Sequence, residues 1–114
     1  MGRKMGISLR SQSEVTILDI EGSLLLTRDN KVREHVAECL AGGRKLLLLN
    51  LAGVREIDSS GVGQLVQVLA STKKAGGQLK LLQPSEFVRK ILSITGLMAV
   101  FECYDEEAAA LASY

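Results

Sequence analysis

One short stretch of the chain, IDSSGVGQLVQVL at residues 57–69, combines side chains that could do chemistry with residues that free the backbone. It contains one acid, two hydroxyls and two glycines, which are Asp58, Ser59, Ser60, Gly61 and Gly63. Such a group could cap a helix, hold a phosphate on backbone N–H groups, supply a nucleophile, or present a serine that receives phosphate. The rest of the sequence has to discriminate among these possibilities.

A serine nucleophile needs a general base, and the chain has a single histidine, His35, inside a predicted helix. The stretch also departs from the G-x-S-x-G elbow of the α/β-hydrolases, because Ile57 stands where the first glycine belongs. A lone histidine on a helix is more often a surface or boundary residue than a catalyst. We therefore predict no catalytic residue and no enzyme activity.

Phosphate and metal binding find little support in the same residues. The segment SSGVGQ has no lysine after its glycines, as a Walker sequence requires, and Val66 replaces the third glycine of the dinucleotide fingerprint. No histidine, cysteine or acid cluster has metal-ligand spacing. We predict no cofactor and no metal. Composition and spacing alone thus favour a capped strand-to-helix turn at residues 58–60.

Composition excludes several other classes of function. The chain has 114 residues, 46% of them apolar and 24% charged, and a formal net charge of +1, which fits one soluble domain without a nucleic-acid footprint. No apolar run approaches the ~20 residues that span a bilayer, and no signal peptide is evident. Cys39 and Cys103 lie in apolar patterns, as expected for free thiols in the hydrophobic core of a protein. A cytoplasmic setting follows.

Strand and helix patterns alternate along the chain. β-branched or continuous apolar runs predict strands at 7–11, 15–20, 24–26, 45–51 and 78–82, with Gly22 as an interruption, and residues 99–103 form either a last strand or an extended edge. Apolar residues at helical spacing predict helices over 32–40, from about Ser60 to Lys74, and over 85–95, and an Ala-rich helix follows through Ser113. The expected caps are Asp29 or Asn30 for the first helix, Ser85 for the third and Asp105 for the last, and the aspartate and serines of DSSG are all suitable caps for the helix that begins near Ser60.

These patterns predict a single α/β domain with a mixed β-sheet of about four to five strands packed with about four α-helices. The strand, helix and strand over 45–82 form a βαβ unit, so its two strands should be parallel. We expect residues 1–6 to form a disordered N-terminal segment and residues 7–114 to form the domain.

Several segments, in this order and spacing, resemble the STAS family, in particular the bacterial anti-sigma factor antagonists. They are the apolar strand with Asn50, IDSSGVG at the strand–helix junction, AGGQLKLL, SITGL and VFECYDEEAAAL. The similarity runs from about Ile7 to the C-terminus. It implies a STAS-type domain that works by binding a partner in the cytoplasm rather than by catalysis.

The resemblance also implies roles for the residues of the junction. Ser59, directly after the aspartate, matches the position that a partner kinase phosphorylates in these antagonists. Asp58 would support its hydroxyl, Ser60 would cap the helix, and Gly61 and Gly63 would keep the turn accessible. These residues and Val62 would form the supporting loop and partner surface.

The partners that the resemblance implies are an anti-sigma factor with serine kinase activity and a serine phosphatase acting on phospho-Ser59. The unphosphorylated antagonist would bind the anti-sigma factor and release a sigma factor. One residue departs from the family pattern, because Leu25 occupies a place that is often acidic. The oligomeric state stays open. Two alternatives also remain: a STAS subunit of an ABC lipid-transport system, and a component of a stressosome-type scaffold.

Overall fold

The computed structural model describes residues 6–24 and 31–114 of the chain. Leu25, the expected caps Asp29 and Asn30, and all but the last residue of the predicted N-terminal segment 1–6 lie outside the described residues.

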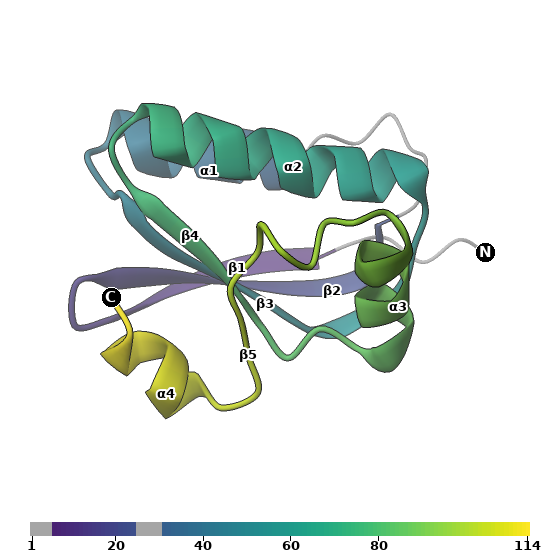
Figure 1. Cartoon of the computed structure of the whole chain (residues 1–114). Coiled ribbons are helices and arrows are strands. Elements are labelled where there is room, and N and C mark those ends of the chain that lie inside the picture. Colours follow the sequence, from purple (N-terminus) through teal and green to yellow (C-terminus); the bar gives the residue numbers. More distant parts are fainter. Residues whose placement is uncertain (1–5, 25–30) are drawn as a thin grey trace.

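Five strands form one sheet in the order β1-β2-β3-β4-β5 (Figure 1). Strand β1 pairs antiparallel with β2, and the other neighbours pair in parallel, so the predicted mixed sheet is confirmed. The strands are β1 Gly6–Gln12, β2 Val15–Leu24, β3 Leu46–Ile57, β4 Gln78–Leu82 and β5 Cys103–Tyr104.

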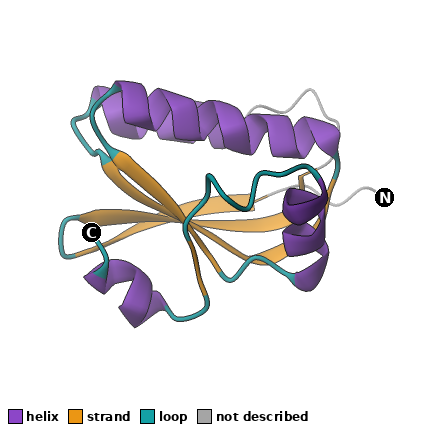
Figure 2. Cartoon of the chain, in the orientation of Figure 1, coloured by secondary structure: helices purple, strands orange, loops and turns teal. Residues whose placement is uncertain are grey.

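Helices cover both faces of this sheet, but unequally (Figure 2). Helices α1 and α2 lie side by side on one face, α3 packs into the same core, and the short α4 covers part of the opposite face (Figure 1). The helices are α1 Lys31–Ala41, α2 Ser59–Lys74, α3 Glu86–Ile94 and α4 Glu107–Ala112.

The alternation of side chains along β3 creates two separate cores. Leu47, Leu49 and Leu51 face α1, α2 and α3 in the larger cluster, whereas Leu48 faces α4 in a smaller one. A strand that is buried on both faces reads as a continuous apolar run, which is why KLLLLNL shows no alternation.

Strand β3 is much longer than the predicted segment 45–51 and runs on to Ile57. It pairs with β4 only as far as Asn50, but its pairing with β2 continues to the pair Leu24 and Ile57. The prediction that Gly22 interrupts the strand was therefore wrong. Gly22 adopts φ 110 inside β2, and a shift in the β2–β3 register lies between Gly22 and Ser23.

A close approach of β2 to β3 explains one glycine of the extended strand. A Cβ atom on Gly53 would lie 2.9 Å from Cγ of Glu21 and 3.1 Å from the carbonyl oxygen of Ile20. Because such distances are shorter than normal contacts, a side chain at Gly53 would push the two strands apart.

The C-terminal third also differs in detail from the prediction. Of the expected segment 99–103, only Cys103 lies in a strand, the two-residue β5, which ends at Tyr104. Asp105 does not cap α4: its carboxylate pairs with the Arg89 guanidinium, and the residue at the cap position, Glu106, makes no side-chain cap hydrogen bond. Ser85 caps α3 as predicted, accepting from the Val88 N–H at 3.1 Å.

Candidate functional site

The serine pair lies where β3 ends and α2 begins, at the end of the sheet that also leads into α3 (Figure 1). Asp58, between the strand and the helix, has extended backbone angles of φ −119 and ψ −172. Its Oδ1 accepts a hydrogen bond from the N–H of Gly61 at 3.0 Å, and its carbonyl oxygen accepts from Val62 at 2.9 Å. Asp58 therefore satisfies one of the N–H groups that a helix leaves unpaired at its start.

This geometry corrects the prediction for Ser60. Sequence reasoning placed the cap at Ser60, but β3 extends to Ile57 and the helix begins at Ser59, so Asp58 takes the cap position. Ser60 is then the second helical residue, and it is half-buried.

The two serines differ in their access to solvent. Ser59 is exposed, whereas Gly61 and Val62 behind it are buried. Val62 is only 6% exposed and belongs to the large core. Val62 thus packs the first turn of α2 into the core, and Asp58 caps the start of the helix. Ser59 stands on the outside of this turn.

Gly63 follows one turn further along α2 and is half-buried. A Cβ atom built on it would meet nothing within 4 Å. Sterics at this residue therefore do not require glycine, and the predicted role of Gly63 in keeping the turn accessible remains a prediction.

A buried acceptor lies in the same helix. Gln64 is 7% exposed, and its Oε1 has no hydrogen-bond partner within the part of the chain that the structure describes. Sequence reasoning missed this residue, because a glutamine in a helix is ordinarily solvated.

A second polar group, which sequence reasoning also missed, joins β1, β2, β3 and α4. Asp19 accepts from the Arg10 Nε at 2.6 Å and from the Asn50 Nδ2 at 2.7 Å. The Arg10 guanidinium also binds Glu107 on α4 at 2.6 Å. The Arg10 hydrogen bonds lower the pKa values of Asp19 and Glu107 and raise that of Arg10, so all three stay charged near neutral pH.

The remaining reactive side chains are occupied or buried. Nδ1 of His35 lies 2.7 Å from the carbonyl oxygen of Lys31 in its own helix, so this nitrogen donates. Burial raises the pKa values of the Cys39 and Cys103 thiols, which keeps them protonated. Over residues 6–24 and 31–114, no group of three or more metal-binding side chains comes together. Nor does any described helix have the length and apolar character to cross a membrane.

The fold is that of a known family. The chain belongs to the STAS domain family, whose model matches residues 6–110. A candidate anti-sigma factor antagonist of Thermotoga neapolitana is 39% identical over 74 residues, which are 65% of this chain and 66% of that protein. The anti-sigma F factor antagonist of Paenibacillus polymyxa is 24% identical over 106 residues, 92% of this chain and 91% of that relative.

Solved structures agree with this assignment. The crystal structure of a candidate anti-sigma factor antagonist of Thermotoga maritima is 28% identical, with a TM-score of 0.84 over 94% of this chain and 92% of that one. The phosphorylated form of the Bacillus cell fate determinant SpoIIAA is 22% identical, with a TM-score of 0.73 over 96% of this chain and 100% of that one, which supports the fold alone. The predicted family and fold class are confirmed.

Proposed function

We propose that this chain is an anti-sigma factor antagonist controlled by phosphorylation of Ser59. In this proposal the unphosphorylated protein binds, in the cytoplasm, an anti-sigma factor that has serine kinase activity, and a sigma factor is released. A serine phosphatase acting on phospho-Ser59 restores the binding form. The chain itself acts by binding and not by catalysis.

The observation that carries the proposal is the position of Ser59, exposed on the first turn of α2 directly after the capping residue Asp58. A kinase can reach a hydroxyl in this position without unfolding any element. The neighbouring Ser60 is half-buried, which makes it the poorer acceptor. The names of the relatives from Thermotoga and Paenibacillus support the same class of function.

Phosphorylation at this position should change binding and leave the fold intact. A phosphate adds roughly −1.5 to −2 charges at neutral pH. The positive end of the α2 dipole tolerates this charge, and Val62 keeps the first turn anchored in the core. The negative charge next to Asp58 then repels acidic groups of a docked partner and costs desolvation at the interface.

The test compares three baits in extract from the source cell: wild type, Ser59→Asp, and Ser60→Asp as the matched control. We expect wild type and Ser60→Asp to retain an anti-sigma factor of the kinase type, and Ser59→Asp to lose at least about tenfold in affinity. With ATP, mass spectrometry should place the phosphate on Ser59. Circular dichroism should show that all three proteins remain folded.

Two results would contradict the proposal. One is equal binding by wild type and Ser59→Asp. The other is capture of a transporter ATPase or of a STAS scaffold by both baits, which would favour the alternative functions and leave residues 58–60 as a capped turn.

A further inference from the structure

The outer surface of the α1 and α2 layer has two parallel faces of different character. Helical spacing places four residues on the outer face of each helix, and each of the eight is exposed or half-buried. On α1 they are Glu34, Ala37, Glu38 and Ala41, and on α2 they are Gly63, Gln67, Ala70 and Lys74.

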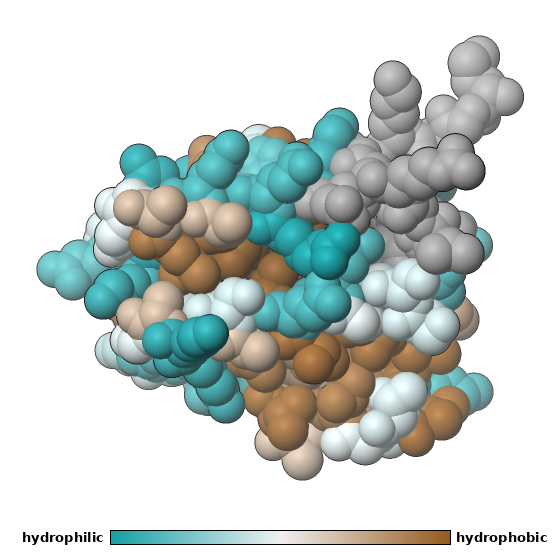
Figure 3. All heavy atoms as spheres, turned by 90° about the horizontal axis from the view of Figure 1, so that it is seen from above, coloured by the Kyte–Doolittle hydropathy of each residue, from teal (hydrophilic) through white to brown (hydrophobic). Residues whose placement is uncertain are grey.

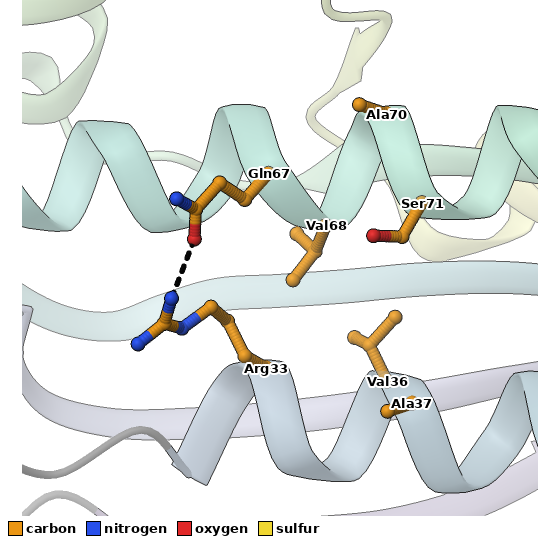
Figure 4. Close-up of a pocket in the computed structure, with 7 residues that line it drawn as sticks. All are labelled: Arg33, Val36, Ala37, Gln67, Val68, Ala70 and Ser71. Carbon is orange, nitrogen blue, oxygen red and sulfur yellow. Dashed lines mark hydrogen bonds between the residues drawn. The ribbon is translucent and has the colours of Figure 1, made fainter.

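A groove of about 510 Å³ separates the two helices along this surface. Figure 4 shows Val36 and Val68 facing each other across it and the hydrogen bond of 2.7 Å from Arg33 to Gln67 that closes one end. Figure 3, which looks down on this layer, shows hydrophobic atoms in a hollow that hydrophilic atoms border on several sides, and a second hydrophobic area beside it. Small side chains at Ala37 and Ala70 leave the groove open to another helix.

The charges on this surface are divided between the helices. Helix α2 has no charged residue from Ser59 to Thr72, and its first charges are Lys73 and Lys74. Helix α1 carries Glu34 and Glu38 on its outer face, while its bases Lys31 and Arg33 stand at other positions of the helix. In the described residues, neither Glu38 nor Lys74 has an ion-pair partner.

Glu38 on α1 and Lys74 on α2 lie at nearly the same height along the helix axes. The helices run in the same direction, and Arg33 lies opposite Gln67 (Figure 4). At equal rise per residue, Glu38 is then level with Thr72, so Lys74 is displaced by only about 3 Å along the axis. A copy turned about an axis parallel to the helices would place α1 of each molecule on α2 of the other.

We propose that this surface binds a second copy of the chain, with α1 of each copy on α2 of the other. The two-fold axis brings Glu38 to Lys74 of the second copy, and the symmetry repeats this contact. The small side chains of Ala37 and Ala70 allow α1 of one copy to approach α2 of the other closely. An axis perpendicular to the helices is disfavoured, because it would set the acidic face of α1 against itself.

The proposed contact is separate from phosphorylation. It is centred on residues 67–74 of α2, and Ser59 lies about 12 Å before Gln67 by the helical rise. Dimerisation can therefore fail while the switch at Ser59 holds, and the reverse is also possible.

Sedimentation equilibrium of the full chain tests the proposal. The wild-type mass should rise with concentration from 12.3 kDa toward twice that value. Glu38→Lys and Lys74→Glu should each weaken dimerisation by roughly tenfold, because each reversal sets like charges together at both symmetric contacts. The double variant Glu38→Lys/Lys74→Glu should return to within about threefold of wild type, since it restores opposite charges.

A matched pair of alanine variants tests the face itself. Ala70→Glu puts a charge on the groove and should weaken dimerisation at least about tenfold, whereas Ala108→Glu, on the exposed side of α4, should leave it unchanged. A monomeric wild type at about 1 mM, equal dimerisation of both alanine variants, or a double variant no tighter than its parents would each overturn the proposal. Should Ala70→Glu unfold, the charge-reversal series decides the question.

Discussion

The two faces of the sheet are closed by different physics. On one face, three helices bury an apolar cluster of nineteen residues. On the other, the six-residue helix α4 adds its Ala110 to a cluster of only five buried residues, and polar contacts hold the helix in place. Lys80, only 3% exposed, donates to the carbonyl oxygen of Ser113 at 2.9 Å, and the Tyr114 hydroxyl donates to the carbonyl oxygen of Leu47. Arg10 holds Glu107 at the other end of α4.

The contrast predicts which face of the sheet responds first to changes in pH and salt. Apolar burial depends little on pH or salt, whereas partly exposed ion pairs are screened by salt and lose strength when one partner is protonated. The α4 face should therefore loosen first, while the face that supports α2 and its serine junction persists. Four predictions test this contrast.

The largest effect is expected from two adjacent leucines that point to opposite faces. Leu49 and Leu48 are both 0% exposed, the first in the large cluster and the second in the small one. Leu49→Ala should cost about 3–5 kcal/mol of unfolding free energy, and Leu48→Ala about 2–3, because the short α4 can settle into part of the cavity. Urea unfolding measures both. Equal costs would show that the two faces are equally rigid.

The second prediction removes the buried cation under α4. Lys80→Met deletes the donor to Ser113 and should lower the unfolding free energy by about 1–3 kcal/mol, because the carbonyl of the half-buried Ser113 loses its partner. The exposed Lys90→Met is the control and should change stability by less than about 0.5 kcal/mol. Unchanged stability of Lys80→Met would mean that the contacts of Lys80 do not hold α4.

The third prediction concerns pH. The pKa values of Asp19 and Glu107 lie below their ordinary values of 3.8 and 4.5, mainly through hydrogen bonds to Arg10. Their stabilisation is therefore present above those ordinary values and is lost as the pH falls through the folded-state values. Arg10→Met should cost about 1 kcal/mol at neutral pH and progressively less toward about pH 3.

The measurement for this third case is a series of urea titrations across that pH range. Arg55→Met, at an exposed residue of β3, provides the control. A cost for Arg10→Met that stays constant as the carboxylates protonate would rule out the ionic explanation.

The smallest effect is expected from a substitution that stabilises α2 and leaves the α4 face of the sheet unchanged. Gly63→Ala should raise stability by about 0.5–1 kcal/mol, because Gly63 lies within α2 with open space at its Cβ position. Gly43→Ala, at φ +84, should instead destabilise, because an L side chain rarely adopts that conformation. Thermal unfolding of the two variants measures the difference, and a destabilising Gly63→Ala would reveal a contact that this structure lacks.

The sequence predicted best those features that depend on neighbouring residues. Strand β4 matches the predicted segment 78–82, and the Ser85 cap of α3 is correct, because apolar periodicity and capping are local signals. The start of α2 at Ser59 was predicted to within one residue from the same kind of signal. The capping residue was predicted two positions too late, at Ser60 instead of Asp58, because the end of β3 depends on its pairing with β2.

Features that depend on distant residues could not be predicted in this way. Arg10 and Glu107 form an ion pair across nearly the whole length of the chain, and nothing in the residues around either one indicates the other. Asp105 looked like a helix cap by type and position, but the fold brings Arg89 close enough to bind its carboxylate. In both cases tertiary contacts decided between two uses of one side chain.

The unequal length of β3 also has a mechanical consequence. Beyond Asn50 the strand has no β4 beside it, yet its ladder with β2 reaches Ile57, one residue before Asp58. A partner that pulls on Ser59 along the strand axis would load the hydrogen bonds of this ladder in shear, together, and would not peel them apart one by one. The exposed serine is thus attached to the sheet through a long central strand, and force applied there is distributed over the whole β2–β3 pairing.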